Sequence, residues 1–372
     1  MWRRASAGAG AVAVAIGLVA ALRPHLLLKV PRYGFVLWAM AGQRLPPFLS
    51  FDAFAGDEHR TWLRDGDLVV AVAAKSGTTW MLYCSHQIRT KASDEFDFGD
   101  VSYSTPWPEM LQAPGQTWEA MKALLNSTVL PDGTRLKDYW DHPKFPFRIF
   151  KSHAYPRDAG GTLPVRERPR VRYLAMVRNH LDQLASFAPF FDQHTDAYRA
   201  EWGGFPPRAS GDAHEVAEQL LRHMQPGGAM ADLVLPYVKG WWRARREPNV
   251  LLLHYADALN DLPGTVRALA AFLGVALSDA EFARVTHRCS MEHMRTVSRQ
   301  FLYQQPLNAR HVHALEDRAI VRRGALGDGD AVLNGEQKVR WRAVEEAGYA
   351  DEPGLVEWVR DGRAGTSAGA RA

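Results

Sequence analysis

Residues 68–80 read LVVAVAAKSGTTW, and this stretch decides the fold. Its first part, residues 68–73, is a short and continuous apolar run, which is typical of a parallel strand buried on both faces. A helical pattern begins directly after the polar turn at residues 75–77. A strand that turns sharply into a helix presents free backbone N–H groups and the positive end of the helix dipole to an anion. The stretch therefore predicts a phosphate-binding turn at the end of a buried strand.

Similar apolar runs recur along the chain and alternate with helical patterns. The strand-like runs are residues 68–73, 147–150, 171–177 and 250–253, and the helical patterns occupy residues 78–88, 181–191, 230–246, 265–272 and 279–287. This alternation predicts an α/β fold: a single P-loop-like domain with a central parallel sheet flanked by helices on both faces. We expect the domain to span residues 46–350. Residues 351–372 are predicted to be a C-terminal tail whose small, polar end is disordered.

The amino-terminal segment, residues 1–45, carries an uncharged apolar run at residues 5–22 between Arg4 and Arg23. A helix that spans a bilayer needs about 20 apolar residues, so this run is at the short end of the range. Three interpretations stay open: a signal anchor or other membrane-associated segment, a cleaved signal peptide, and a soluble Ala-rich helix. The location is therefore open between a membrane, such as that of the Golgi, and the cytoplasm. The sequon at Asn126 would be glycosylated only if the body faces a lumen.

Charge and cysteine content exclude some classes of protein. The formal net charge is +4 over 372 residues, which is too small for a protein that coats nucleic acid but suits an enzyme whose substrate carries several phosphates. The two cysteines, Cys84 and Cys289, lie far apart in the sequence and form neither a disulfide framework nor a metal-binding motif. We therefore expect no nucleic-acid partner and no metal.

The turn after the first strand has the residue types that a phosphate site needs. Lys75 supplies a full charge, and Gly77 lets the backbone approach a phosphate closely. Ser76, Thr78 and Thr79 supply hydroxyl donors. The Walker A motif of NTPases is different, because its Lys follows a glycine-rich lead-in. An ATP- and Mg-dependent P-loop phosphotransferase is therefore disfavoured but stays an alternative.

Residues 75–80, KSGTTW, resemble the 5′-phosphosulfate loop of the sulfotransferases that use 3′-phosphoadenosine-5′-phosphosulfate (PAPS), whose core is PKSGTTW. Ala74 stands in place of the Pro. The motif KSH that ends in His153 resembles the KTH of the cytosolic-type members, in which the His deprotonates the acceptor. The resemblance implies that His153 is the general base and that Lys75 and Lys151 stabilise charge on the transferred group.

Further motifs of the same family follow in order along the chain. The strand-terminal Arg178 and the later Ser186 resemble the family's 3′-phosphate site, although His180 stands where the family usually has Pro. The RRG motif at residues 322–324 resembles the segment that closes over the same phosphate, although Gly329 stands where Trp is expected. The resemblance implies that this phosphate is held by Arg178, Ser186, Arg322, Arg323 and Gly324.

The purine side of the nucleotide is also implied by the resemblance. Trp80 and Tyr255 would approach the adenine. Cys289 and Met291 stand where relatives have a Thr and a Phe that help to hold the purine, so the contacts there are altered. The PWPE motif at residues 106–109 resembles the acceptor-side segment of these enzymes.

The resemblance implies transfer of a sulfuryl group from PAPS to a hydroxyl or amine of a small-molecule or lipid acceptor, with release of adenosine 3′,5′-bisphosphate and without a metal. Besides the phosphotransferase, a non-enzymatic, membrane-tethered nucleotide-binding module stays an alternative. The KxxxTVxxxE dimer motif of many relatives is absent near the C-terminus, so the oligomeric state stays open.

Overall fold

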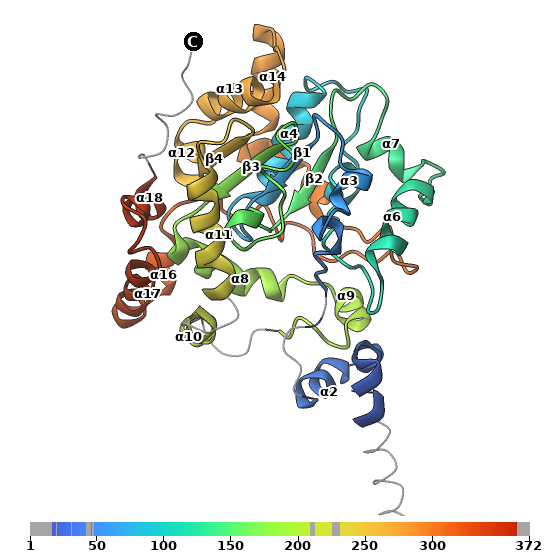
Figure 1. Cartoon of the computed structure of the whole chain (residues 1–372), viewed down its shortest axis with the longest axis vertical. Coiled ribbons are helices and arrows are strands. Elements are labelled where there is room, and N and C mark those ends of the chain that lie inside the picture. Colours follow the sequence, from blue (N-terminus) through green and yellow to red (C-terminus); the bar gives the residue numbers. More distant parts are fainter. Residues whose placement is uncertain are drawn as a thin grey trace, which may run out of the picture.

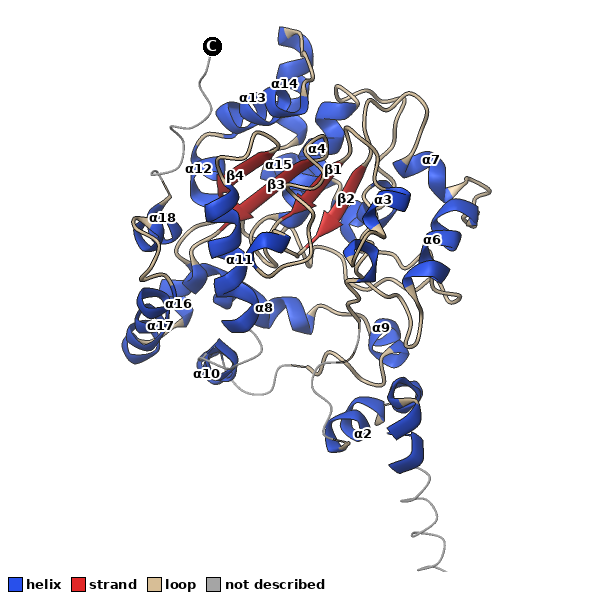
Figure 2. Cartoon of the chain, in the orientation of Figure 1, coloured by secondary structure: helices blue, strands red, loops and turns tan. Residues whose placement is uncertain are grey.

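The computed structural model describes residues 17–19, 21–30, 32–41, 46, 48–208, 213–224 and 231–362. Its centre is a four-stranded parallel sheet in the order β2-β1-β3-β4. The strands are β1 Leu68–Ala71, β2 Ile149–Ser152, β3 Arg172–Val177 and β4 Val250–His254. Figure 2 shows the strands side by side with helices around them, which confirms the predicted α/β fold.

Helices supply the connections between the strands, as parallel pairing requires. In chain order the helices, with η for short 3-10 turns, are η1 Pro24–Lys29, α2 Gly34–Met40, η2 Asp52–Phe54, α3 His59–Trp62, α4 Thr78–Arg89, α5 Val101–Ser104, α6 Trp118–Ser127, α7 Leu136–Trp140, η3 Arg157–Ala159, α8 His180–Asp192, α9 Asp196–Glu201, α10 Ala213–Met224, α11 Ala231–Ala244, α12 Tyr255–Asn260, α13 Leu262–Leu273, α14 Asp279–Arg288, α15 Met291–Thr296, η4 Ser298–Phe301, α16 Asp328–Val332, α17 Gly335–Gly348 and α18 Leu355–Asp361. The helix α4 packs against β1 and β2, whereas α11 packs against β4 (Figure 1).

The strand register brings the segments that follow the strands to one edge of the sheet. Ala71 is opposite Ser152, and Val177 is opposite His254. The turn that begins after β1 therefore lies beside the residues that follow β2, β3 and β4. Ligands of open parallel sheets bind at this carboxyl edge.

The two ends of the chain are only partly described. Most of the apolar run at residues 5–22 lies outside the described residues, and no helix in the described part of the chain is long and apolar enough to cross a membrane. At the other end, α18 packs Trp358 against Trp242, with ring centroids 5.1 Å apart. The predicted disorder concerns residues 362–372, of which only Gly362 belongs to the described part.

Candidate functional site

The turn between β1 and α4 has the geometry of an anion-binding loop. Lys75 has a φ of 63° and Gly77 a φ of 98°, so two left-handed residues turn the chain sharply into the helix. A Cβ on Gly77 would lie 3.0 Å from the Met176 sulfur and 3.2 Å from the Tyr255 ring. Only glycine fits this position, and the first amides of α4 point out of the turn without partners in the helix.

The three hydroxyls of the loop differ in their bonding. Thr78 Oγ1 donates to the carbonyl of Ala73 at 3.2 Å, and Thr79 Oγ1 bonds to Tyr303 Oη at 2.8 Å. Ser76 Oγ is fully buried and has no hydrogen-bond partner among the described residues. A buried hydroxyl without a partner is costly unless a ligand satisfies it, so Ser76 is the hydroxyl most available to an anion.

Two lysines at this edge lie against aromatic rings rather than against carboxylates. Lys75 Nζ is 4.0 Å from the centre of the Phe190 ring, and Lys151 Nζ is 3.7 Å from the Trp107 ring. Burial, with repulsion from Arg322 and Arg178, lowers the pKa of Lys75 to about 7. Burial and repulsion from Lys75 hold the pKa of Lys151 well below its usual range. A bound anion would relieve this repulsion between cations.

His153 follows β2 and is held in one tautomer. Its Nδ1 is 2.6 Å from the carbonyl of Val72, and because a carbonyl can only accept, Nδ1 carries the proton and Nε2 keeps a free lone pair. Burial, and then repulsion from Lys151, lower the pKa of His153 to about 3. The ring is therefore neutral at physiological pH, with Nε2 able to take a proton.

A buried carboxylate fixes the end of β2. Glu109 accepts hydrogen bonds from Ser152 Oγ at 2.7 Å and from the His153 backbone N–H at 3.1 Å. It also accepts from Trp107 Nε1 at 2.9 Å, and burial raises its pKa. The sequence pointed to Glu109 only as part of the PWPE motif, and its contacts now show that it positions the backbone of His153.

Arg178, which the resemblance assigns to the 3′-phosphate, lies next to the loop. Its Nη1 donates to the carbonyl of Lys75 at 3.4 Å and its Nη2 to that of Ala325 at 3.1 Å. Its Nε is buried and has no partner among the described residues. Asp182 lies 3.8 Å from Nη2 and accepts from the backbone of Gly327 and Gly329. Arg178 therefore joins the loop to the segment at residues 325–329.

The other residues predicted for the 3′-phosphate differ in burial and in their partners. Ser186 is partly buried on α8, the helix that follows Arg178. Arg322 and Arg323 are exposed, and Arg323 forms an ion pair with Asp328 at 3.2 Å. A Cβ on Gly324 would meet the Met291 side chain at 2.8 Å. The structure thus brings Met291 and the 322–324 turn together.

The aromatic residues predicted for the purine pack on each other. The rings of Trp80 and Tyr255 meet edge to face, with centroids 5.6 Å apart. Trp80 Nε1 donates to the carbonyl of Cys289 at 2.8 Å. Cys289 itself is fully buried, so its backbone holds the indole while its thiol packs in the core near Cys84.

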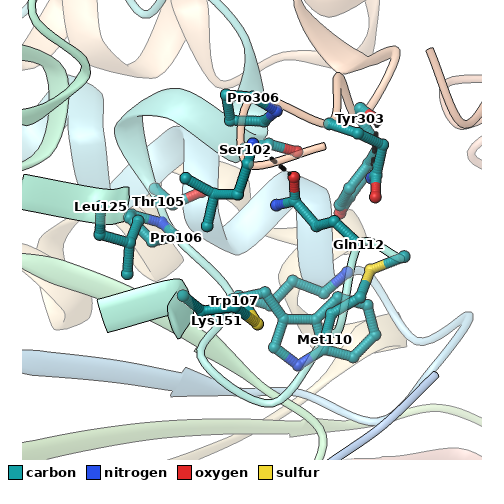
Figure 3. A pocket seen from close by; sticks show the side chains of 13 residues that line it. Ser102, Thr105, Pro106, Trp107, Met110, Gln112, Leu125, Lys151, Tyr303 and Pro306 are labelled. Carbon is teal, nitrogen blue, oxygen red and sulfur yellow. Dashed lines mark hydrogen bonds between the residues drawn. The ribbon is translucent and has the colours of Figure 1, made fainter. Parts of the chain in front are cut away.

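A cavity of about 20 Å³ is lined in part by Lys151, and it has room for about one water. Figure 3 shows its lining gathered from segments far apart in the sequence. The lining residues are Ser102, Thr105, Pro106, Trp107, Met110, Gln112, Met121, Leu125, Lys151, Tyr303, Gln305, Pro306 and Leu307. The lining mixes apolar and polar side chains, and it includes Lys151 and Tyr303, whose hydroxyl bonds to Thr79 of the loop.

Gln305 stands out in this lining. It is 1% exposed, and its Nε2 donates to the carbonyl of Tyr303 at 3.3 Å. Its Oε1 has no partner among the described residues. Sequence reasoning missed both Tyr303 and Gln305, because they belong to no motif and reach the site only through the fold.

The described residues contain no cluster of three or more His, Cys, Asp or Glu side chains that could hold a metal ion. The basic side chains at the site are Lys75, Lys151, Arg178 and Arg322. Arrangements of this kind stabilise anionic groups electrostatically.

Comparison with known proteins is consistent with this geometry. Residues 65–339 match the sulfotransferase domain family. The chain is 21% identical over 296 residues to the amine sulfotransferase of Oryctolagus cuniculus, a match that covers 80% of this chain and 85% of that protein. It is 24% identical over 323 residues to the glycolipid sulfotransferase of Mycobacterium bovis, covering 82% and 90%. Retinol dehydratase, solved in complex with androsterone and the inactive cofactor PAP, has a similar fold, with a TM-score of 0.58, 19% identity and coverage of 81% and 85%.

Proposed function

Because the chain belongs to the sulfotransferase domain family, we propose that it transfers a sulfuryl group from PAPS to a hydroxyl or amine of an acceptor and releases adenosine 3′,5′-bisphosphate. One observation carries this proposal. The Nδ1 of His153 bonds to the carbonyl of Val72, three residues before Lys75, so the imidazole is held where the phosphate loop begins. A base and an anion site are therefore adjacent, as a transfer to a deprotonated nucleophile requires.

The residues present fit the donor. The loop of residues 75–80, with its free amides and the unpartnered Ser76 hydroxyl, would hold the 5′-phosphosulfate. Arg178, whose Nε is unpartnered among the described residues, would hold the 3′-phosphate together with Ser186 and the 322–324 turn. The aromatic pair of Trp80 and Tyr255, together with Cys289 and Met291, would lie toward the purine.

The chemistry assigned to the side chains is a single displacement. His153 Nε2 takes the proton of the acceptor, whose oxygen or nitrogen forms a bond to sulfur. The bond between sulfur and the bridging oxygen of the donor breaks, and its electron pair stays on the bisphosphate. Lys75 and Lys151 stabilise the negative charge that develops on that bridging oxygen and on the sulfuryl oxygens.

A binding panel tests the proposed donor against the phosphotransferase alternative. We expect adenosine 3′,5′-bisphosphate and PAPS to raise the melting temperature of the purified protein without any divalent cation. Adenosine 5′-monophosphate, which lacks the 3′-phosphate, serves as the matched control and should shift it much less. Stabilisation by ATP with magnesium alone would instead support a phosphotransferase, and no shift with any nucleotide would contradict both.

The acceptor is proposed to be a small molecule or a lipid headgroup that carries a second hydrogen-bond donor. Support comes from Gln305, whose buried Oε1 is unpartnered and lines the cavity beside Lys151. A site built to accept a hydrogen bond discriminates strongly against molecules that lack the donor. Among diols and their mono-hydroxyl analogues, Gln305→Leu should therefore lower kcat/KM for the diols only. An equal loss for both groups would contradict this assignment.

A further inference from the structure

The exposed apolar side chains of this protein are concentrated near its amino terminus. Ten large apolar side chains are exposed in the described part of the chain, and six of them fall between residues 18 and 40. We call these six the N-terminal apolar face: Leu18, Leu22, Val30, Tyr33, Val36 and Met40. Their exposed fractions reach 73% at Leu22 and 79% at Met40. Exposed apolar side chains that gather in one segment in this way mark a candidate interaction site.

The charge of the same segment has one sign. From Met1 to Phe51 the sequence contains no Asp or Glu, and the first acidic residue is Asp52. The same stretch contains six basic residues, namely Arg3, Arg4, Arg23, Lys29, Arg32 and Arg44. Apolar side chains mixed with Arg and Lys, without acidic residues, complement the surface of a bilayer that contains anionic lipids.

The segment contacts the body of the protein through its inner side. Leu28 and Trp38 are buried on its inner side. The Phe35 backbone N–H donates to the carbonyl of Gly203 at 2.8 Å, and the Phe35 ring lies 5.2 Å from the Phe205 ring. Figure 1 shows α2 at one end of the molecule, next to α9. The N-terminal apolar face therefore lies on a segment that packs against the body.

This surface shares a wall with the cavity beside Lys151. A Cβ on Gly115 would lie 2.7 Å from the His25 ring, so η1 packs on the 112–116 segment. The carbonyl of Phe48 accepts from the Leu111 N–H at 2.9 Å, and Leu49 is bridged to Met110. Met110 and Gln112 in turn line the cavity.

We propose that residues 18–40 dock on the surface of an anionic lipid bilayer and bring the cavity beside Lys151, which borders the proposed acceptor side of the site, to the membrane surface, so that the acceptor is a molecule held in the bilayer. The first part stands on the apolar face and its charge. The second part rests on the proposed sulfotransferase function. In this arrangement residues 1–45 act as a membrane-associated segment and residues 46–350 as the catalytic domain.

Vesicle binding tests the docking directly. The full-length protein should co-sediment with vesicles of phosphatidylcholine and phosphatidylglycerol, bind weakly to phosphatidylcholine alone, and be released by salt. Val36→Glu and Met40→Glu should each reduce the bound fraction on the order of tenfold, because each places a negative charge on the face that would insert into the bilayer. Val339→Glu is the matched control, since Val339 is equally apolar and 65% exposed but lies on α17, and it should bind like wild type.

Three outcomes would overturn the docking proposal: wild type that stays in the supernatant with anionic vesicles, equal binding to neutral vesicles, or unchanged binding of the Val36 and Met40 variants. Hydrogen exchange tests the shared wall, because residues 24–40 and 110–116 should both gain protection on anionic vesicles while α17 should not. If only residues 24–40 gained protection, the second part of the proposal, that the acceptor is a molecule held in the bilayer, would be wrong. Stabilisation by adenosine 3′,5′-bisphosphate, measured on the same samples, reports separately on the proposed function.

Discussion

Lys75 lies in the proposed phosphate loop, but its ammonium group is surrounded by protein rather than by water. Burial and two nearby arginines lower its pKa to about 7, so in the free enzyme its ammonium loses charge as the pH rises through that value. In the proposed site the charged form attracts the 5′ end of the nucleotide more strongly than the neutral form does, so the affinity for adenosine 3′,5′-bisphosphate should fall above pH 7. Calorimetric titration from mildly acid to mildly alkaline pH measures this. Lys75→Arg, which stays charged, should show a flat profile; parallel profiles for the two proteins would contradict the assignment.

Glu109 acts on His153 through the backbone. Replacing Glu109 by Gln leaves one of its donors, Ser152 Oγ or the His153 N–H, without a good acceptor. We expect the free energy of unfolding to fall by about 1–3 kcal/mol and kcat to fall on the order of tenfold to a hundredfold. Binding of the bisphosphate should not change, because Glu109 does not contact the phosphate loop. Glu119→Gln, at an exposed position of α6, is the control, and an unaltered kcat in Glu109→Gln would refute the positioning role.

Among the elements, the turn into α4 places a strict requirement on one residue, because Gly77 has a left-handed φ and close neighbours. Gly77→Ala combines a strained φ of 98° with a contact of 3.0 Å to the Met176 sulfur. Gly133→Ala has a similar φ of 87° but no atom within 4 Å. Both should lose about 1–2 kcal/mol of stability from the left-handed φ, whereas only Gly77→Ala should lose nucleotide binding. Equal nucleotide affinity in the two variants would show that the loop is not the phosphate site.

The elements that the sequence predicts well are those with a local signal. Residues 68–80 carry both an apolar strand and a helix start, and the structure places β1 and α4 there. The second strand is predicted at 147–150 but is observed at Ile149–Ser152. The polar Lys151 and Ser152 belong to the strand because pairing with Val70 and Ala71 decides its end. The pattern of apolar residues in the sequence does not show where such strand pairing ends.

Side chains that reach the site from distant parts of the chain could not be predicted. Tyr303 bonds to Thr79 across 224 residues of sequence, and Gln305 lines the cavity from the same segment. The resemblance predicts that Cys289 helps to hold the purine, and the contact that the structure adds is its backbone carbonyl, which accepts a hydrogen bond from Trp80 Nε1. A carbonyl is the same for every residue type, so the sequence carries no signal for it.

At the scale of the whole molecule, the C-terminal helix α18 closes the far edge of the sheet. Trp358 is 2% exposed and contacts Trp242 and His254. Trp358→Ala should lower the free energy of unfolding by about 3–5 kcal/mol, measured by urea denaturation. Val339→Ala, at an exposed position, should stay within about 0.5 kcal/mol of wild type. A small effect of Trp358→Ala would mean that α18 is not part of the folded core.

The proposed reaction depends on one geometry, in which the neutral imidazole of His153 would face the acceptor beside an anion-binding loop. The most direct measurement follows a radiolabelled sulfuryl group from PAPS to a panel of hydroxyl and amine acceptors, with the released bisphosphate quantified in parallel. Wild type and His287→Ala, which alters an exposed histidine, should transfer the label with matching bisphosphate release. His153→Ala should be slower by roughly 10²–10⁴-fold while its affinity for the bisphosphate is unchanged. Full transfer by His153→Ala, or no transfer by wild type to any acceptor, would contradict the account.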